Sequence, residues 1–262
     1  MRFVSDIDIR SGRLNVGVTD RISASDAIRK AALSTDDTDL VEVPTVEKLT
    51  AAVYGGSRLD GQNYCDSTIC SQEIATTAFT VTNGTTKGVL TAAHVGECAN
   101  SATTCVKNSS MTDQTGVILT YVNQRNAGGE DYEWRTASNT SNTFANIIRY
   151  STATMTVTAT GDPTTYAVGT TVCKQGRTTG YTCGPIQSTN TNINYNGTTG
   201  TYVRVKNSAT GSMCDTGDSG GPLFVSATAL GITHALSTTY PGQCYFMPIQ
   251  RISSLGLSVV VR

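Results

Sequence analysis

Cys-Asp-Thr-Gly-Asp-Ser-Gly-Gly-Pro, residues 214–222, is the stretch of this sequence that most constrains its fold. Its serine, Ser219, lies between glycines, and glycine allows backbone angles that other residues resist. The stretch indicates a tight loop that exposes one hydroxyl and turns backbone N–H groups toward one point, as an activated serine with an oxyanion hole requires. The alternative is an ordinary Asp/Ser/Gly turn between two strands. The rest of the chain has to distinguish these interpretations.

The residues around Ser219 also fit the Gly-x-Ser-x-Gly nucleophile elbow, which requires a helix directly after the serine. Gly-Gly-Pro follows instead, and that is a poor helix start. The elbow further requires an acid and then a histidine downstream, and His234, the histidine after Ser219, is too near. A second known serine motif also fits the stretch around Ser219. Its catalytic residues have the order His, Asp, Ser, with the histidine far upstream.

A histidine does stand far upstream. Residues 89–94 read Val-Leu-Thr-Ala-Ala-His, an apolar strand that ends in small residues before His94. A lone histidine at a strand end is usually a surface or packing residue. Here the joint pattern counts more, because Thr-Ala-Ala-His upstream and Gly-Asp-Ser-Gly-Gly-Pro downstream resemble the two signature stretches of the chymotrypsin-like serine proteases.

Residues 172–184, Val-Cys-Lys-Gln-Gly-Arg-Thr-Thr-Gly-Tyr-Thr-Cys-Gly, resemble the bacterial branch of that family, α-lytic protease and the streptogrisins, as do residues 70–71 and 78–82. The resemblance covers nearly the whole chain from about Val53 and is weakest between Cys105 and Thr165. It implies an all-β fold of two six-stranded antiparallel barrels. The expected division is a small α+β segment and two barrels, at residues 1–52, 53–150 and 151–262.

The sequence from Val53 onward reads as all-β on its own pattern, because short strand-like runs alternate with turn signals such as Asn83-Gly84. Spacing alone would also allow a sandwich. The expected strands are residues 77–82, 87–92, 116–122, 154–159, 170–174, 184–187, 202–206, 222–225 and 230–234. A short helix near residues 249–255 and a last strand at 257–261 are expected to end the chain.

The resemblance implies an acid between the histidine and the serine, and the candidates are Asp113, Asp131 and Asp162. Asp113 lies in a polar, turn-like run, and Asp162 precedes a proline, which also indicates a turn. Asp131 is followed by aromatic residues after a Gly-Gly loop and resembles the family's Asp-aromatic stretch entering a strand. Glu130 is the neighbour that could be confused with it.

These residues together imply a serine endopeptidase with protein or peptide substrates. Ser219 Oγ would attack the peptide carbonyl, His94 would transfer its proton to the leaving amine, and Asp131 would hold the imidazole tautomer. The backbone N–H groups of Gly217 and Ser219 would form the oxyanion hole. No cofactor or metal is expected, since no Cys-x-x-Cys occurs and both histidines have other uses.

Asp218, next to the nucleophile, is expected to point inward. In trypsin-like enzymes this carboxylate pairs with the new N-terminus, whereas the bacterial branch uses a basic side chain. Lys174 stands where that branch carries arginine, and Arg177 is the other candidate. Either pairing would let the site form without an N-terminal switch.

The resemblance places the substrate pocket beside the strand after the nucleophile, where the family has Ser-Gly-Gly. The matching run here is Thr233, His234, Ala235 and Leu236. Leu236 would fill the pocket mouth, and Ser212, near the pocket base, offers no charge, so small aliphatic P1 residues are expected. The alternative is a Glu-preferring pocket containing His234, although the alignment puts His234 one residue late, against the aspartate side of the triad.

Eight cysteines, all after residue 64, favour an oxidising compartment and a secreted protein. Spacing does not select a pairing. The resemblance implies Cys173–Cys183 and Cys214–Cys244; it also favours Cys70–Cys98, which leaves Cys65–Cys105. The family's cysteine directly follows the histidine, whereas here Val-Gly-Glu intervenes before Cys98. The local pairs Cys65–Cys70 and Cys98–Cys105 therefore stay open.

Residues 1–52 contain no cysteine and many of the acidic residues. Alternation across Ser11-Gly12 predicts a β-hairpin over residues 7–18, Ser25-Asp26 predicts a short helix to Leu33, and residues 40–46 predict a further strand. The segment resembles the C-terminal part of the pro-region of α-lytic and streptogrisin precursors. That implies a mature start at Val53 and a latent precursor; the alternative is a small structural appendage.

The composition excludes some function classes. The net charge of −1 and the 15% of charged residues come with no basic cluster for nucleic acid. No apolar run approaches the roughly 20 residues of a membrane helix. No signal peptide begins at Met1, so a secreted form is expected to have lost its leader. The expected partners are protein or peptide substrates and the chain's own N-terminal segment, and the protein is expected to be a monomer. The rival function is a non-catalytic binding protein on a protease fold.

Overall fold

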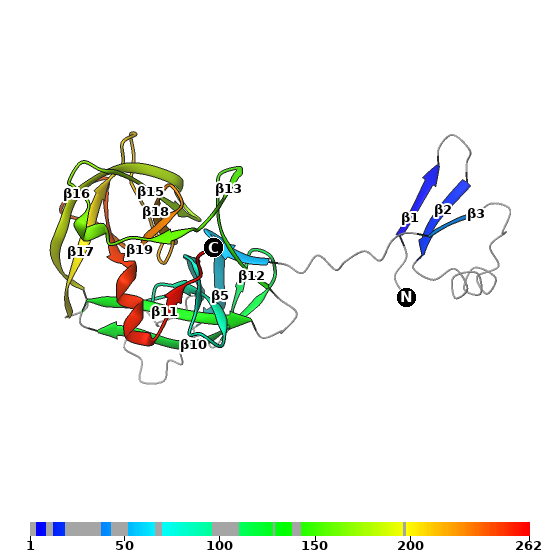
Figure 1. Ribbon diagram of the computed structural model, residues 1–262, viewed down its shortest axis with the longest axis horizontal. Coiled ribbons are helices and arrows are strands. Elements are labelled where there is room, and N and C mark those ends of the chain that lie inside the picture. The colour runs from blue at the N-terminus through cyan, green and yellow to red at the C-terminus, as the bar shows by residue number, and fades with distance from the viewer. Residues whose placement is uncertain are drawn as a thin grey trace. The chain divides into compact units, whose positions relative to one another are not determined.

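The structure, a computed structural model, divides into two compact units, Met1–Leu49 and Thr50–Arg262. It describes residues 52–65, 70–95, 110–127, 129–137, 143–195 and 198–262, together with three strands of the first unit (Figure 1). The assignment of residues 1–52 as a pro-region stays a prediction.

The first unit contains a three-stranded sheet in the order β1-β2-β3. The strands are β1 (Val4–Asp8), β2 (Arg13–Val18) and β3 (Thr38–Glu42). The predicted hairpin is confirmed, since β1 and β2 are antiparallel with Ile7 opposite Leu14. The predicted strand at 40–46 begins and ends earlier, as β3, and pairs in parallel with β2. The predicted helix from Ser25 to Leu33 lies outside the described residues.

The C-terminal part of the second unit is a closed, six-stranded antiparallel barrel. Its strands are β15 (Thr171–Gly176), β16 (Gly180–Tyr195), β17 (Thr198–Lys206), β18 (Pro222–Val225), β19 (Thr228–Leu236) and β20 (Gln243–Pro248). The pairing order β19-β18-β15-β16-β17-β20 closes because β20 also pairs with β19. The short strand β14 (Ala159–Thr160) joins β19 in parallel, and the 3-10 helix η1 (Pro163–Thr165) follows it.

The N-terminal part of the second unit is also all-β, which confirms the predicted fold class. Its larger sheet has the order β21-β7-β8-β11-β10-β9-β5-β6. The strands are β5 (Arg58–Cys65), β6 (Cys70–Thr76), β7 (Thr80–Thr82), β8 (Lys87–Thr91), β9 (Ser110–Asp113), β10 (Ile118–Ala127), β11 (Glu130–Ala137) and β21 (Ser258–Val259). A second sheet holds β4 (Ala52–Gly55), β12 (Thr143–Tyr150) and β13 (Ala153–Thr156).

This N-terminal sheet differs from the expected six-stranded barrel in strand count. Within the described part of the chain its strand pairings form an open eight-stranded order and do not close a ring. The edge strand β21 lies near the C-terminus, within the last strand predicted at residues 257–261. It pairs with β7. The predicted helix near 249–255 is confirmed as the 3-10 helix η2 (Ile249–Leu255).

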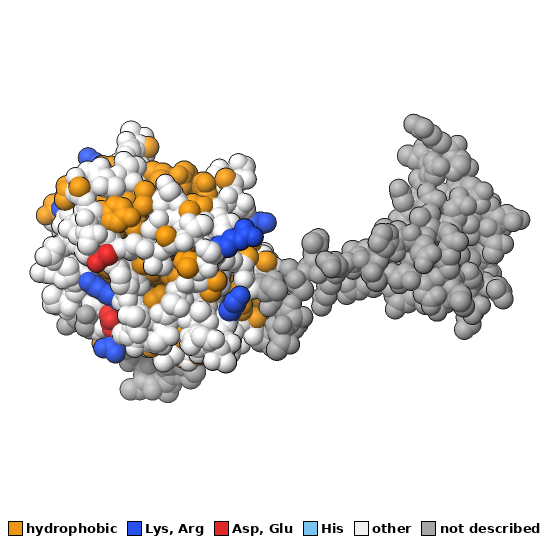
Figure 2. Space-filling model, in the orientation of Figure 1, with side chains coloured by type: hydrophobic (Ala, Val, Ile, Leu, Met, Phe, Trp, Pro, Cys, Tyr) orange, Lys and Arg blue, Asp and Glu red, His pale blue; other side chains and the backbone are white. Residues whose placement is uncertain are grey.

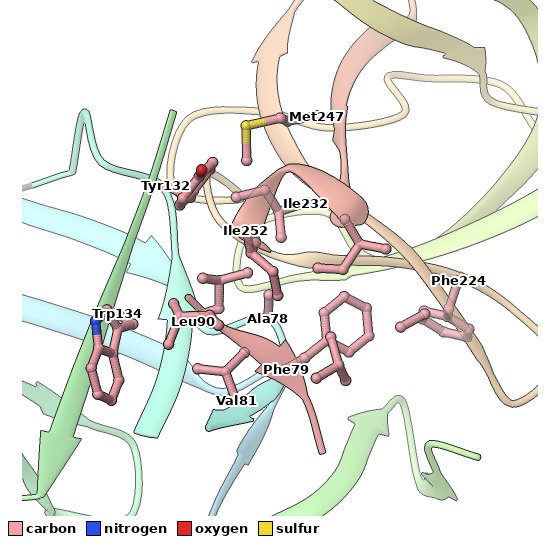
Figure 3. Close-up of a cluster of buried hydrophobic side chains, with 14 of the residues drawn as sticks. Ala78, Phe79, Val81, Leu90, Tyr132, Trp134, Phe224, Ile232, Met247 and Ile252 are labelled. Carbon is pink, nitrogen blue, oxygen red and sulfur yellow. The ribbon is translucent and has the colours of Figure 1, made fainter. Parts of the chain in front are cut away.

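A shared hydrophobic cluster packs the two parts together (Figure 3). Phe79 and Leu90 come from the N-terminal part, Ile232 and Met247 from the C-terminal barrel, and Ile252 from η2, and all are 3% exposed or less. Burying such a side chain is worth roughly 1.5–3 kcal/mol. The cluster therefore holds the N-terminal part and the C-terminal barrel in a fixed relative position, so residues from both can meet in one site.

One face of the second unit carries few charged side chains. On the face in Figure 2, acidic and basic side chains are few and do not gather in one patch of a single sign. Among the described residues, no helix has the length and apolar character that crossing a membrane requires.

Candidate active site

Strand pairing brings His94 and Asp131 together. β8 runs antiparallel to β11 with Thr91 opposite Glu133, so the residues just after β8 lie beside the start of β11. The backbone N–H of His94 donates to Asp131 Oδ1 at 2.8 Å, and His94 Nδ1 lies 2.7 Å from Asp131 Oδ2. An ionised carboxylate only accepts, so Nδ1 carries the proton. Asp131 thus fixes both the ring orientation and its tautomer.

Ser219 completes a chain of three side chains. It lies in the turn before β18, with its Oγ 2.8 Å from His94 Nε2. Because Nδ1 is protonated, Nε2 of the neutral ring can accept the serine proton. The turn is anchored to the N-terminal part, since Thr76 donates its N–H to the Ser219 carbonyl and its Oγ1–H to the Gly217 carbonyl, both at 2.9 Å.

Two glycines of the turn have backbone conformations in the left-handed region, φ +94° at Gly217 and +81° at Gly220. A Cβ on Gly220 would also lie 2.1 Å from Thr91 Oγ1. The Gly-rich stretch is therefore required by geometry as well as by chemistry. Among the described residues no acceptor takes the backbone N–H of Gly217 or Ser219. Two donors at the turn are therefore available, as an oxyanion hole requires.

Asp218 points inward and pairs with Lys174. Lys174 Nζ lies 2.9 Å from Asp218 Oδ2, and both side chains are fully buried. The other carboxylate oxygen accepts the Thr178 N–H at 2.8 Å. Burial lowers the pKa of Lys174, and the Asp218 charge and hydrogen bond oppose that shift. Arg177, the other candidate, pairs with Asp60 at 2.8 Å.

Replacing Lys174 with methionine is expected to destabilise the fold by about 3–5 kcal/mol, because Asp218 would be left buried without its charged partner. The loop that carries Ser219 should be disturbed with it. Urea unfolding measures the change. Arg177→Met is the matched control, since its pair with Asp60 is partly exposed and should cost about 1 kcal/mol or less. Equal losses for the two variants would contradict the structural role given to Lys174.

The charge state of Asp131 follows from its surroundings. The side chain is 1% exposed, and burial alone would raise its pKa. The electrostatic attraction of His94 and the hydrogen bonds from His234 and His94 outweigh burial, and they hold the pKa of Asp131 well below its ordinary value. The carboxyl is therefore ionised across the whole physiological pH range.

The residues expected at the substrate pocket lie in different environments. Thr233 is buried, and its backbone exchanges hydrogen bonds with Gly220 and Gly221. His234 is buried with its Nδ1 2.6 Å from Asp131 Oδ2, on the aspartate side where the alignment put it. Ala235 is partly buried, Leu236 is 46% exposed, and Ser212 is exposed. The structure thus separates His234 from the more accessible residues.

The other acidic residues serve local structure. Asp113 is buried and accepts the Val117 N–H and the Ser57 hydroxyl, each at 3.1 Å. Asp162 caps η1 by accepting the Thr164 N–H at 2.9 Å. Glu130, the neighbour of Asp131, pairs with Arg125. Each of these carboxylates therefore has a structural explanation where it lies.

Within the described residues, His94, Asp131 and His234 are the group whose ligand atoms lie close enough to hold a metal ion, within 4.8 Å of one another. Both Nδ1 atoms point at Asp131 Oδ2 at hydrogen-bond distance. An ion at that point would have to displace both hydrogen bonds. The arrangement therefore fits proton transfer better than metal binding.

Two of the expected disulfides are present, Cys173–Cys183 and Cys214–Cys244. Cys98 and Cys105 lie outside the described residues. Cys65 and Cys70 stand directly opposite each other in the register of β5 and β6. That register favours the local pair Cys65–Cys70 over Cys70–Cys98, and the pairing of these four cysteines stays a prediction.

Tyr202 was not anticipated from the sequence as a residue of this region. Its ring, on β17, stacks on the His234 ring with centroids 4.4 Å apart and planes 12° from parallel. It stands in the predicted strand 202–206, but strand periodicity does not reveal which distant ring a buried tyrosine meets.

Comparison with known proteins finds similar sequences and structures among bacterial proteases. The chain is 31% identical over 188 residues to Streptogrisin-C of Streptomyces griseus, which aligns 70% of this chain with 37% of that protein. It is 31% identical over 146 residues to Serine protease 2 of Streptomyces fradiae, with 56% of this chain and 78% of that protein covered. The crystal structure of Thermobifida fusca Protease A superposes with a TM-score of 0.58 at 28% identity, covering 80% of this chain and all of that one.

The fold and the Ser-His-Asp arrangement are those of a chymotrypsin-like serine protease domain. The chain belongs to the trypsin family, since the family model described as Trypsin matches residues 53–253. The chain spans just over a third of the length of Streptogrisin-C.

Proposed function

We propose that this chain is a secreted serine endopeptidase that works through an acyl-enzyme on Ser219. Ser219 Oγ attacks the peptide carbonyl as His94 Nε2 takes its proton, and Asp131 stabilises the imidazolium that forms. The N–H groups of Gly217 and Ser219 bind the oxyanion, each donor worth about 3–4 kcal/mol of barrier. The observation that carries the proposal is the unbroken chain of contacts, 2.8 Å from Ser219 to His94 and 2.7 Å from His94 to Asp131.

The acyl-enzyme step is tested by rapid mixing with a chromogenic ester of a small acyl group. We expect a burst of leaving group equal to one per active chain, followed by slower turnover, because an acyl-enzyme accumulates. Ser219→Ala should give no burst. Turnover of peptides without any burst, under conditions where deacylation is made slow, would argue against a covalent intermediate. The rival class, a binding protein without turnover, predicts neither burst nor hydrolysis.

The preferred P1 residue is proposed to be small and aliphatic. Leu236 and Ala235 stand where the resemblance has glycines, and Leu236 is 46% exposed, as a side chain at a pocket mouth would be. Fitting a large side chain against it would cost about 1–3 kcal/mol in overlap. The Glu-preferring alternative has less support, since His234 is buried and its Nδ1 is engaged by Asp131.

A peptide library read by mass spectrometry should show cleavage mainly after Ala, Val and Thr. Leu236→Gly should increase cleavage after Phe or Tyr by roughly tenfold to a hundredfold relative to Ala, because it removes the overlap. Val168→Gly is the control, since Val168 is 65% exposed and lies in the loop after η1. Cleavage by the parent chain mainly after Phe, Tyr, Lys or Arg would contradict the small pocket.

Residues 1–52 are proposed to be a pro-segment that assists folding or delays activity. The first compact unit ends at Leu49, and the family match begins at residue 53. The junction reads Thr-Ala-Ala before Val53, so its own P1 residue, Ala52, is small. Secretion is supported by the two disulfides, which are rare in reducing compartments. The mature enzyme is proposed to be a monomer.

N-terminal sequencing of the secreted, active form is expected to begin near Val53. Ser219→Ala produced in the same host is the control, and it should keep residues 1–52 if the chain processes itself. An active form that still begins before residue 40 would refute the pro-segment proposal. An Ser219→Ala chain trimmed at the same bond would instead assign the cut to a host protease.

A further inference from the structure

Asp131 accepts hydrogen bonds from two imidazoles at one oxygen. Oδ2 lies 2.7 Å from His94 Nδ1 and 2.6 Å from His234 Nδ1, while Oδ1 takes the backbone N–H of His94 at 2.8 Å. The two rings meet edge to face, with centroids 5.9 Å apart and planes at 83°. Because an ionised carboxylate offers no proton, both rings must present Nδ1–H to it.

The fold holds His234 in this position by backbone geometry and packing. The register between β19 and β20 shifts between Thr233 and Ala235, with His234 at the irregularity, and such bulges re-aim a side chain. The imidazole is 1% exposed and stacks on the Tyr202 ring at 4.4 Å. Its donor is therefore oriented toward Asp131 before any substrate arrives.

We propose that His234 is a positioning residue for the triad: its Nδ1–H holds Asp131 ionised and oriented, so that Asp131 in turn holds His94 with Nε2 facing Ser219. This inference rests on the proposed function. It differs from the expectation that His234 contacts substrate, because the ring acts through Asp131. A carboxylate this deeply buried stays charged only if hydrogen-bond donors replace water, and His234 supplies one of them.

The test uses two variants that separate the hydrogen bond from the packing. In His234→Asn the amide nitrogen is bonded to Cγ, as Nδ1 is in histidine, so a donor remains where the ring is lost. In His234→Phe a flat ring can still stack on Tyr202, but the donor is lost. We expect His234→Phe to lower kcat about tenfold to a hundredfold, and His234→Asn to stay within about fivefold of the parent chain.

KM should change little in either variant, because His234 does not touch substrate. A His234→Phe enzyme with parent kcat would overturn the proposal, and so would a His234→Asn enzyme as slow as His234→Phe. A rise in KM as the main effect would also overturn it, since that result would return His234 to the substrate pocket.

A second measurement does not depend on turnover or on the folding of a variant. The chain has two histidines, so nitrogen-15 labelling of histidine gives NMR signals from these two rings alone. We expect both rings to carry the proton on Nδ1 at neutral pH and to exchange it slowly. A His234 ring protonated only on Nε2 would overturn the proposal even in an active enzyme. An inactive chain with Nδ1–H on both rings would instead refute the proposed function and leave the hydrogen-bond assignment intact.

Discussion

Ser219→Ala is expected to leave a folded chain that hydrolyses peptides roughly 10⁶-fold more slowly than the parent. Ser219 Oγ is the atom that His94 Nε2 contacts at 2.8 Å, and alanine removes this proposed nucleophile while changing little else in the turn. The anchoring bonds of the turn are made by backbone carbonyls at Gly217 and Ser219, so they should survive. The measurement is kcat with a peptide substrate, alongside an unfolding curve.

Two further variants sharpen this result. Ser253→Ala removes an exposed serine of η2 and should leave kcat unchanged. The double variant Ser219→Ala with His94→Ala should be no slower than either single variant, because residues that act as one unit lose their effect together. Losses that simply multiply would mean that Ser219 and His94 do not share one step.

Asp131→Asn is expected to lower kcat by about 10⁴-fold. An amide can turn its NH₂ group toward His94, and the imidazole would then hold its proton on Nε2, facing the serine. The ionised carboxylate would also be lost from beside the imidazolium. Asp131 Oδ2 accepts a hydrogen bond from Nδ1 of both His94 and His234, so this variant should also disturb the Nδ1–H signals of both histidines.

Asp113→Asn is the matched control for that variant. Asp113 is buried, 2% exposed, as Asp131 is, but it accepts from a turn, namely the Val117 N–H and the Ser57 hydroxyl. Its substitution should cost stability and leave kcat near the parent value. If Asp131→Asn kept a near-normal rate while Asp113→Asn did not, the assignment of the acid would be wrong.

The sequence was informative where chemistry demands particular residue types. The turn around Ser219 needs glycine at positive φ, so the glycines at 217 and 220 reveal the turn in the sequence itself. His94 and Asp131 could be placed because a strand end and an aromatic-rich strand resembled known stretches. What made them neighbours is the register of β8 and β11, which no local pattern specifies.

Local sequence patterns do not specify the contacts between distant strands. The resemblance put Lys174 at the family's basic position, but Arg177, which is also basic and close in sequence, stayed an alternative partner for Asp218. The strand β15 buries Lys174, whereas Arg177 follows the end of that strand and reaches Asp60. The His234 hydrogen bond likewise depends on a register irregularity in β19 and on Tyr202 from another strand.

Labelling with a fluorophosphonate probe, followed by mass spectrometry of the labelled peptide, tests the central claim most directly. The probe reacts with a serine only when a neighbouring base and an oxyanion hole activate it. One label per chain on Ser219, absent in His94→Ala, is the expected result. Labelling that begins only after residues 1–52 are removed would add latency to this account. A folded, processed chain that takes no label, or takes it on another residue, would contradict the assignment of Ser219 as the nucleophile.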